Sequence, residues 1–343
     1  MKSIYVALLS TTMLFASALG QDATPDNSGA KMKAQALMPI AASRVPSLPA
    51  AADESLTLLP HWKQGEKHRF EVVKSCQKRN GEKTTLNSVG RTGLEIEVLS
   101  TAKDAVVLAW TFGGTKLDDP GQAGNPFIRK MTNLLKGYRI VLELDSQAAI
   151  QGVQNWKEVK ETAAKVFETM TNELKLEGMD QATIEKTLAP IASMYATKEQ
   201  IEQFCTREAQ LFFIAMGIEF NGNNPVEYDA ELPNPLGGEP FPSRARIVLK
   251  EADHKLGVAK VSWTQTVAPE DVCRIMEKTL NEMVEESGKS IPDSDALKTL
   301  NFEDTAEFNI DIPSGWIRNL TYKRLTRVKG ISQEDVITVT RKN

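Results

Sequence analysis

Alternation of apolar and polar residues recurs along this chain and limits what it can fold into. Leu94, Ile96 and Val98 alternate with glutamates, and Val106, Leu108, Trp110 and Phe112 fall at every second position. Side chains of a β-strand point alternately to its two faces, so each such segment buries one face and hydrates the other. One-sided strands are typical of antiparallel sheet. The strands expected on this pattern are 68–76, 94–98, 106–112, 138–144, 243–251, 255–267, 304–312, 316–328 and 333–341.

Helical periodicity interrupts the strands in the middle of the chain. Residues 155–176 carry one apolar stripe that includes Trp156, Phe167 and Met170, which predicts an amphipathic helix. Thr197 and Gln200 form a capping box for a helix that runs to about Met216. A further helix is expected after Pro269.

Runs of strands separated from runs of helices predict an α+β fold. We expect a long curved antiparallel β-sheet, either open or an unclosed half-barrel, packed on the amphipathic helices. Residues 54–343 form one α+β domain on this interpretation, either undivided or in two lobes, 54–220 and 221–343.

The first twenty residues predict a secretory signal peptide. Lys2 supplies a positive start, Ile4–Phe15 is mostly apolar, and Ala18 and Gly20 are small residues just before a cut at Gln21. The apolar run is short for a bilayer-spanning helix. The expected location is therefore the periplasm or the outside of the cell, with no transmembrane segment after signal cleavage. Residues 21–53 are rich in Ala, Pro and Ser and predict a disordered linker.

Charge and motifs exclude several classes of function. A formal net charge of −4 disfavours nucleic acid as a partner. The three histidines stand at no metal-ligand spacing, and no serine-hydrolase or zinc-protease motif occurs, so the sequence predicts no catalytic, metal-binding or cofactor-binding residues. We expect no cofactor.

Three cysteines follow the expected cleavage site: Cys76, Cys205 and Cys273. In an oxidising compartment, Cys205 and Cys273 are the favoured disulfide pair, because both fall on expected helices. The alternative is that all three are small buried apolar residues.

Aromatic residues are spread along the chain, where each serves either the core or a ligand platform. The candidates for a ligand cavity are Trp110, Trp156, Phe167, Phe212 and Trp263.

Residues 313–343, at the C-terminal end, are basic. On alternating strands these residues predict a positive outer face, which either meets anionic lipid or a cell-wall polymer or is simply solvated. The residues concerned are Arg318, Lys323, Arg324, Arg327, Lys329, Arg341 and Lys342.

Two segments carry a resemblance to known proteins. They are residues 136–154, which read KGYRIVLELD and then IQGVQ before a long helix, and residues 308–315, FNIDIPSG, followed by two closing strands. They resemble an uncharacterised family of exported bacterial proteins, a domain of unknown function in which a strand ends in Asp and a turn leads to a helix. The resemblance covers roughly residues 56–343 and implies an envelope location without a known activity. The layout is also similar to that of envelope carriers of lipoproteins and lipids, in which a curved unclosed sheet wraps helices around an apolar cavity.

Three functions remain open from the sequence. The first is an exported, non-enzymatic protein that binds an apolar or amphipathic ligand between sheet and helices. The second is a protein–protein interaction module of the cell envelope, which uses a sheet edge or residues 21–53. The third is a hydrolase whose site is assembled from distant residues.

Overall fold

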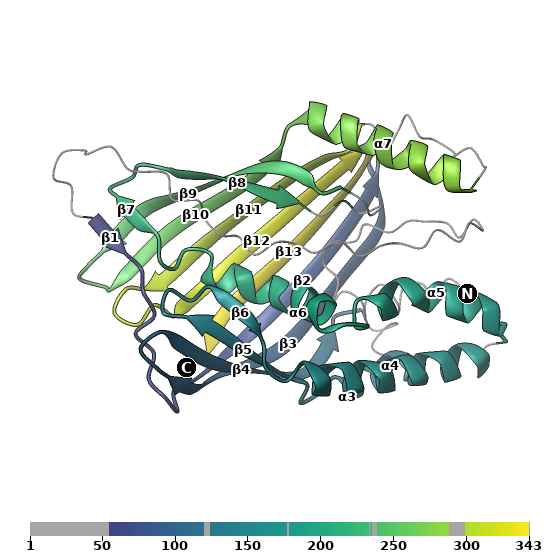
Figure 1. Cartoon of the computed structure of the whole chain (residues 1–343), viewed down its shortest axis with the longest axis horizontal. Helices are drawn as coiled ribbons and strands as arrows, with labels where there is room; N and C mark the ends of the chain where they lie inside the picture. The colour runs from purple at the N-terminus through teal and green to yellow at the C-terminus, as the bar shows by residue number, and fades with distance from the viewer. Residues whose placement is uncertain are drawn as a thin grey trace.

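The structure, a computed structural model, describes residues 55–119, 124–176, 178–232, 234, 239–287 and 299–342. The signal peptide expected at 1–20 and the linker expected at 21–53 lie outside these residues. Eleven antiparallel strands form one open sheet in the order β6-β5-β4-β3-β2-β13-β12-β11-β10-β9-β8. Figure 1 shows this sheet curving around helix α6. The expected α+β fold with an unclosed antiparallel sheet is therefore confirmed.

The first half of the sheet is a meander that runs outwards from the centre. Residues with alternating burial form each strand, and the buried positions share one face. The strands are β2 (Lys67–Asn80), β3 (Lys83–Thr101), β4 (Ala105–Leu117), β5 (Arg139–Asp145) and β6 (Ile150–Val153).

The second half returns from the opposite edge to the centre. It comprises β8 (Val226–Leu232), β9 (Phe241–Asp253), β10 (Val258–Val267), β11 (Asn301–Asp311), β12 (Ile317–Val328) and β13 (Ile331–Lys342). The last strand, β13, pairs with β2, so both expected lobes share one sheet. A separate two-stranded sheet joins β1 (Ser55–Thr57) to β7 (Glu219–Asn221).

Five helices pack against or beside the sheet in the described part of the chain. They are α3 (Pro126–Leu134), α4 (Trp156–Leu176), α5 (Gln181–Ser193), α6 (Lys198–Phe213) and α7 (Pro269–Ser287). The predicted stripe of α4 is buried at Val159, Ala163, Met170 and Leu174. The predicted capping box of α6 is present, with the Thr197 hydroxyl accepting from the Gln200 backbone and the Gln200 side chain accepting from the Thr197 backbone.

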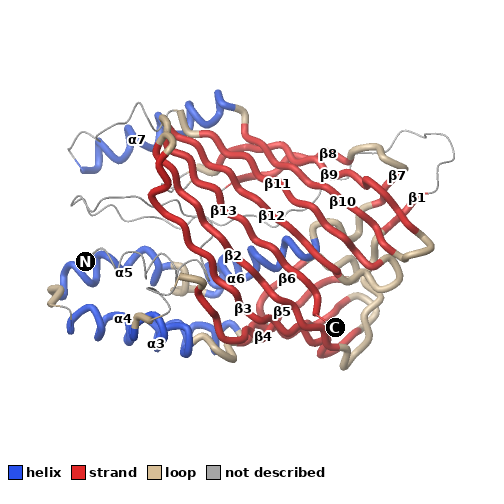
Figure 2. The backbone as a smooth tube through the Cα atoms, turned by 180° about the vertical axis from the view of Figure 1, so that it is seen from behind, coloured by secondary structure: helices blue, strands red, loops and turns tan. Residues whose placement is uncertain are grey.

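The main hydrophobic core lies between one face of the sheet and α6. We call this the inner face; it carries Phe70, Leu108, Phe308 and Leu320, all 2% exposed or less. Figure 2, which views the molecule from behind, shows α6 on the far side of the strands. Two smaller cores lie among α3, α4 and α5 and beneath α7. Within the described residues, no helix combines the length and apolar character needed to cross a membrane.

Candidate functional site

Aromatic side chains gather where the C-terminal end of α6 meets the inner face. Trp62 stacks on Trp316 with ring centroids 4.7 Å apart, and the Phe213 ring lies 5.6 Å from Trp62. On the other side of this group, Phe212 packs edge-on against Trp110 at 4.6 Å. We call Trp62, Phe70, Trp110, Phe212, Phe213 and Trp316 the aromatic cluster.

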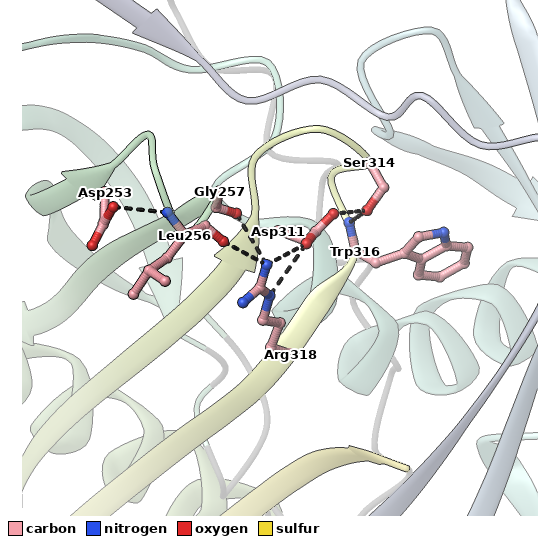
Figure 3. A network of polar contacts seen from close by, with 7 residues as sticks. All are labelled: Asp253, Leu256, Gly257, Asp311, Ser314, Trp316 and Arg318. Carbon is pink, nitrogen blue, oxygen red and sulfur yellow. Dashed lines mark hydrogen bonds and ion pairs between the residues drawn. The ribbon is translucent and has the colours of Figure 1, made fainter. Parts of the chain in front are cut away.

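A hydrogen-bonded turn between β11 and β12 places Trp316 in this cluster (Figure 3). Arg318 Nη2 donates to Asp311 Oδ1 at 2.6 Å and to the Leu256 carbonyl at 3.0 Å, and Ser314 donates to the other Asp311 oxygen. Burial opposes ionisation of Asp311, but the bonds from Ser314 and Arg318 outweigh it and lower its pKa. Gly315 has a φ of +76°, and a Cβ there would lie 2.5 Å from the Leu59 carbonyl oxygen. Only glycine therefore allows this turn to lie against the segment that carries Trp62.

Glu66 satisfies the indole N–H of Trp316. The Trp316 Nε1 donates to Glu66 Oε1 at 2.9 Å, and His68 Nε2 lies 2.8 Å from the same oxygen. Burial tends to raise the pKa of Glu66, but the hydrogen bonds from His68, the Lys63 backbone and Trp316 together lower it. The carboxylate therefore stays ionised beside the aromatic rings.

The other two indoles of the cluster differ from Trp316. Trp62 is 7% exposed and Trp110 is 3% exposed, yet in the described part of the chain no acceptor meets either Nε1–H. A buried donor without an acceptor costs about 1–3 kcal/mol, and most buried polar groups in native proteins have a partner. The aromatic cluster therefore offers two donors to an acceptor that no described residue supplies.

A row of polar side chains crosses the same inner face. In register across six neighbouring strands lie Ser88, Cys76, Asp335, Arg324, Asp304 and Gln265, which we call the polar row. Arg324 and Asp304 are 7% and 1% exposed and form a two-pronged ion pair, with Arg324 Nε 2.7 Å from Asp304 Oδ1. Such a pair is tolerated in the interior because each charge is neutralised and hydrogen-bonded.

Asp335, Cys76 and Gln265 of the polar row also have polar neighbours. Gln333 donates to Asp335 at 2.9 Å, and Gln265 donates to Ser243 at 2.6 Å. Burial raises the pKa of Asp335, although the bonds from Gln333 and Cys76 oppose the rise. Burial also raises the pKa of the Cys76 thiol.

Helix α6 brings two charged residues over the inner face. Glu208 forms an ion pair with Lys74 of β2. Its neighbour Arg207 lies close enough to Arg324 and Asp304 to feel their charges. The face between α6 and the sheet therefore has an aromatic end and a charged centre.

The structure brings together two of the five aromatic residues predicted to line a cavity. Trp110 and Phe212 contact each other, as described. Trp263 lies on β10 and donates to Tyr228 Oη at 2.9 Å, while Trp156 and Phe167 lie half-buried on α4. All five contribute to or pack against the main core, and their role in a ligand cavity stays a prediction.

The predicted disulfide is wrong: Cys205 and Cys273 are both free thiols. Cys205 lies on α6 within the main core, where its Sγ is 3.8 Å from Tyr138 Oη. Cys273 lies on α7, which covers a different core at the other end of the strands. Burial raises the pKa of Cys205 to about 12, although the bond with Tyr138 opposes the rise.

The predicted positive outer face also needs correction. Arg324 points to the inner face because it shares the phase of Leu320 and Tyr322, not that of Lys323. On the outer face, Lys323 pairs with Glu334 and Lys342 pairs with Glu71. Acidic neighbours on adjacent strands therefore neutralise much of the basic stretch.

Sequence reasoning missed the polar row, although its signal is visible. Asp304, Arg324 and Asp335 occupy positions where the alternation of their strands calls for an apolar residue. Charged residues at inward positions are rare unless they are paired. Among the residues that the structure describes, no three His, Cys, Asp or Glu side chains cluster so as to hold a metal ion.

The similarity of this chain to known proteins is low in sequence. No protein-family model matches the sequence, so the resemblance to exported bacterial proteins stays an expectation. No curated protein matches it either. Among solved structures, the chain is similar to lipovitellin, in work described as "Lipid-protein interactions in lipovitellin", with a TM-score of 0.38 and 12% identity. The match covers 82% of this chain and 25% of that chain, so this protein spans about a quarter of the length of lipovitellin.

Proposed function

We propose that this chain is an exported protein that binds an amphipathic ligand between the inner face of its sheet and α6. The observation that carries the proposal is the pair of buried indole donors at Trp62 and Trp110. They lie in an apolar, aromatic setting, which suits an alkyl chain, and no described residue accepts their hydrogen bonds, which suits a ligand that carries oxygen atoms.

The open sheet supports access to this face. Among the described strands, β6 and β8 each have one neighbour in the sheet, so the two edges are not joined to each other. The sheet can therefore widen around an inserted molecule without breaking a ladder of hydrogen bonds. The ion pair between Glu208 of α6 and Lys74 of β2 would keep this part of the helix attached to the sheet.

Export is part of the proposal and rests on the sequence of residues 1–20. Cleavage before Gln21 would release the protein into the periplasm or the medium. The alternative of a partner protein added to a sheet edge finds less support. The β6 edge has four residues, and β8 carries Glu227, Asp229 and Glu231 outwards, which discourages strand addition.

The test is native mass spectrometry of the full chain purified from its own host, followed by organic extraction. The purified protein is then incubated with three twelve-carbon amphiphiles: laurate, dodecyl phosphate and dodecanol. A co-purifying amphiphile, or saturable binding of at least one of the three, is expected. If the protein carries none and binds none, the proposal is wrong.

Substitution of the two indoles locates the site. Trp62→Phe and Trp110→Phe each remove a donor, so each should weaken binding about 2–10-fold, the equivalent of one hydrogen bond. Trp156→Phe is the matched control, because Trp156 lies half-buried on α4 outside the aromatic cluster. Equal effects of all three substitutions would place the ligand elsewhere.

A further inference from the structure

Arg207 stands out among the charged groups that face the sheet. In the described part of the chain it makes no hydrogen bond or ion pair, whereas Arg324, Lys74 and Arg318 each have a carboxylate partner. Arg207 remains partly exposed, so water reaches its guanidinium group. Burial, with the nearby charge of Arg324, lowers its pKa to about 10.

The nearby carboxylates are already engaged. Asp304 accepts both prongs of Arg324, and Glu208 is paired with Lys74. Asp335 accepts a hydrogen bond from Gln333 and lies next to Arg324 in the polar row, on the adjacent strand. Arg207 therefore lies beside the buried Arg324, and Asp304 is paired with Arg324 alone, so the guanidinium charge of Arg207 has no ion-pair partner among the described residues.

Apolar side chains flank the charged centre on the inner face. Next to the polar row, in register across β13, β12, β11 and β10, lie Ile337, Tyr322, Ala306 and Trp263. The following row is Val339, Leu320, Phe308 and Val261. A molecule with one charged end and an alkyl chain matches this order of charge and apolar surface.

We propose that Arg207 binds the anionic head group of the ligand, a carboxylate or a phosphate monoester, while its alkyl chain lies along the apolar rows towards the aromatic cluster. The inference rests on the proposed function and specifies its ligand class. A guanidinium group is suited to this role because its planar fork matches carboxylate and phosphate oxygens.

The experiment compares laurate and dodecyl phosphate with dodecanol, which has the same chain without the charge. Intrinsic tryptophan fluorescence reports binding below the critical micelle concentration. The wild-type chain should bind each anionic amphiphile at least about tenfold more tightly than dodecanol, the value of a charge-assisted hydrogen bond. Arg207→Gln should remove this difference and leave dodecanol binding unchanged, and Arg207→Lys should restore part of it.

Arg327→Gln is the matched control, because Arg327 lies on β12 with its side chain exposed on the outer face. It should leave all affinities unchanged. Equal binding of the three amphiphiles by the wild-type chain would overturn the head-group inference while the proposed function stands. So would an equal loss of all three in Arg207→Gln.

Two further ligands, which are small anions without an alkyl chain, test whether the site binds an amphiphile or any free anion. Acetate and inorganic phosphate should not bind measurably, because they lack the alkyl chain. If inorganic phosphate binds as tightly as dodecyl phosphate, the inference of an amphiphile is wrong. If no amphiphile binds, the proposed function fails with it.

Discussion

The polar row and the aromatic cluster lie on the same inner face, but their buried polar groups are satisfied differently. In the polar row, the Arg324 and Asp304 charges meet in a two-pronged ion pair. In the aromatic cluster, the indoles of Trp62 and Trp110 have no acceptor among the described residues. An unpaired buried charge costs far more than an unpaired indole. The protein therefore pairs its fully buried charges internally and leaves unmatched only donors that it can tolerate.

Arg207 shares a property with each region: it is charged, like the polar row, and it lacks a partner among the described residues, like the two indoles. It is charged and has no ion-pair partner in the described chain, but its partial exposure lets water solvate it. The candidate ligand contacts on this face are therefore groups that can lack a partner at a small cost in folding free energy, either because they are neutral or because water solvates them.

The largest expected effect comes from breaking the ion pair of the polar row. Asp304→Asn removes the ion-pair partner of the buried Arg324 and should lower the free energy of unfolding by about 3–5 kcal/mol. Denaturant unfolding measures this change. Glu303→Gln is the control on the opposite face of the same strand, where Glu303 and Arg327 are exposed and 3.8 Å apart. It should cost less than about 1 kcal/mol, and equal costs for the two substitutions would contradict the comparison.

A smaller effect separates the satisfied indole from an unsatisfied one. Trp316→Phe removes the bond to Glu66 and should cost about 1.5–3 kcal/mol beyond the loss of packing. Trp110→Phe removes a donor that has no acceptor, so relief of its desolvation should offset part of the packing loss. Chemical denaturation of both variants should rank Trp316→Phe as the less stable. The reverse order would show that the unpaired indole N–H of Trp110 does not destabilise the folded protein.

The smallest effect is a difference in pH dependence between two acids. The pKa of Glu66 is lowered below 4.5, so its stabilisation is present above that pH and is lost as pH falls through the folded-state pKa. The pKa of Asp335 is raised above 3.8, so its contribution is present below that pH and is lost as pH rises through the folded-state pKa.

Unfolding free energies between pH 3 and pH 7 test this difference. Relative to the wild-type chain, Glu66→Gln should lose stability as pH rises, whereas Asp335→Asn should gain it. Parallel curves for the two variants would contradict the opposite pKa shifts.

Much of the fold was predictable because alternation and capping are local signals. The strand expected at 106–112 falls within β4, the one expected at 304–312 overlaps β11 as far as Asp311, and the Thr197 capping box begins α6 where expected. Elements with weaker signals were missed. On the edge strand β8, three of the four inward residues, Val226, Tyr228 and Ala230, are only half-buried, and α3 has just nine residues.

The candidate site was less predictable. Trp110 and Phe212 were expected at a shared site and do contact each other. The pairing of Cys205 with Cys273 failed because helix position alone does not say which helices are neighbours. The prediction that Arg324 lies on the outer face was wrong because it followed from the charge of the residue and not from the alternation of buried and exposed positions in its strand.

The sequence by itself determined which segments become strands and which side of each strand is buried, because those properties depend on neighbouring residues in the chain. Only the tertiary structure decided that β13 pairs with β2. That pairing joins residues far apart in sequence, and its register depends on the whole sheet. It is this register that aligns Cys76, Asp335, Arg324 and Asp304 in one row on the face that α6 covers, where Arg207 of α6 lies near Arg324 and Asp304.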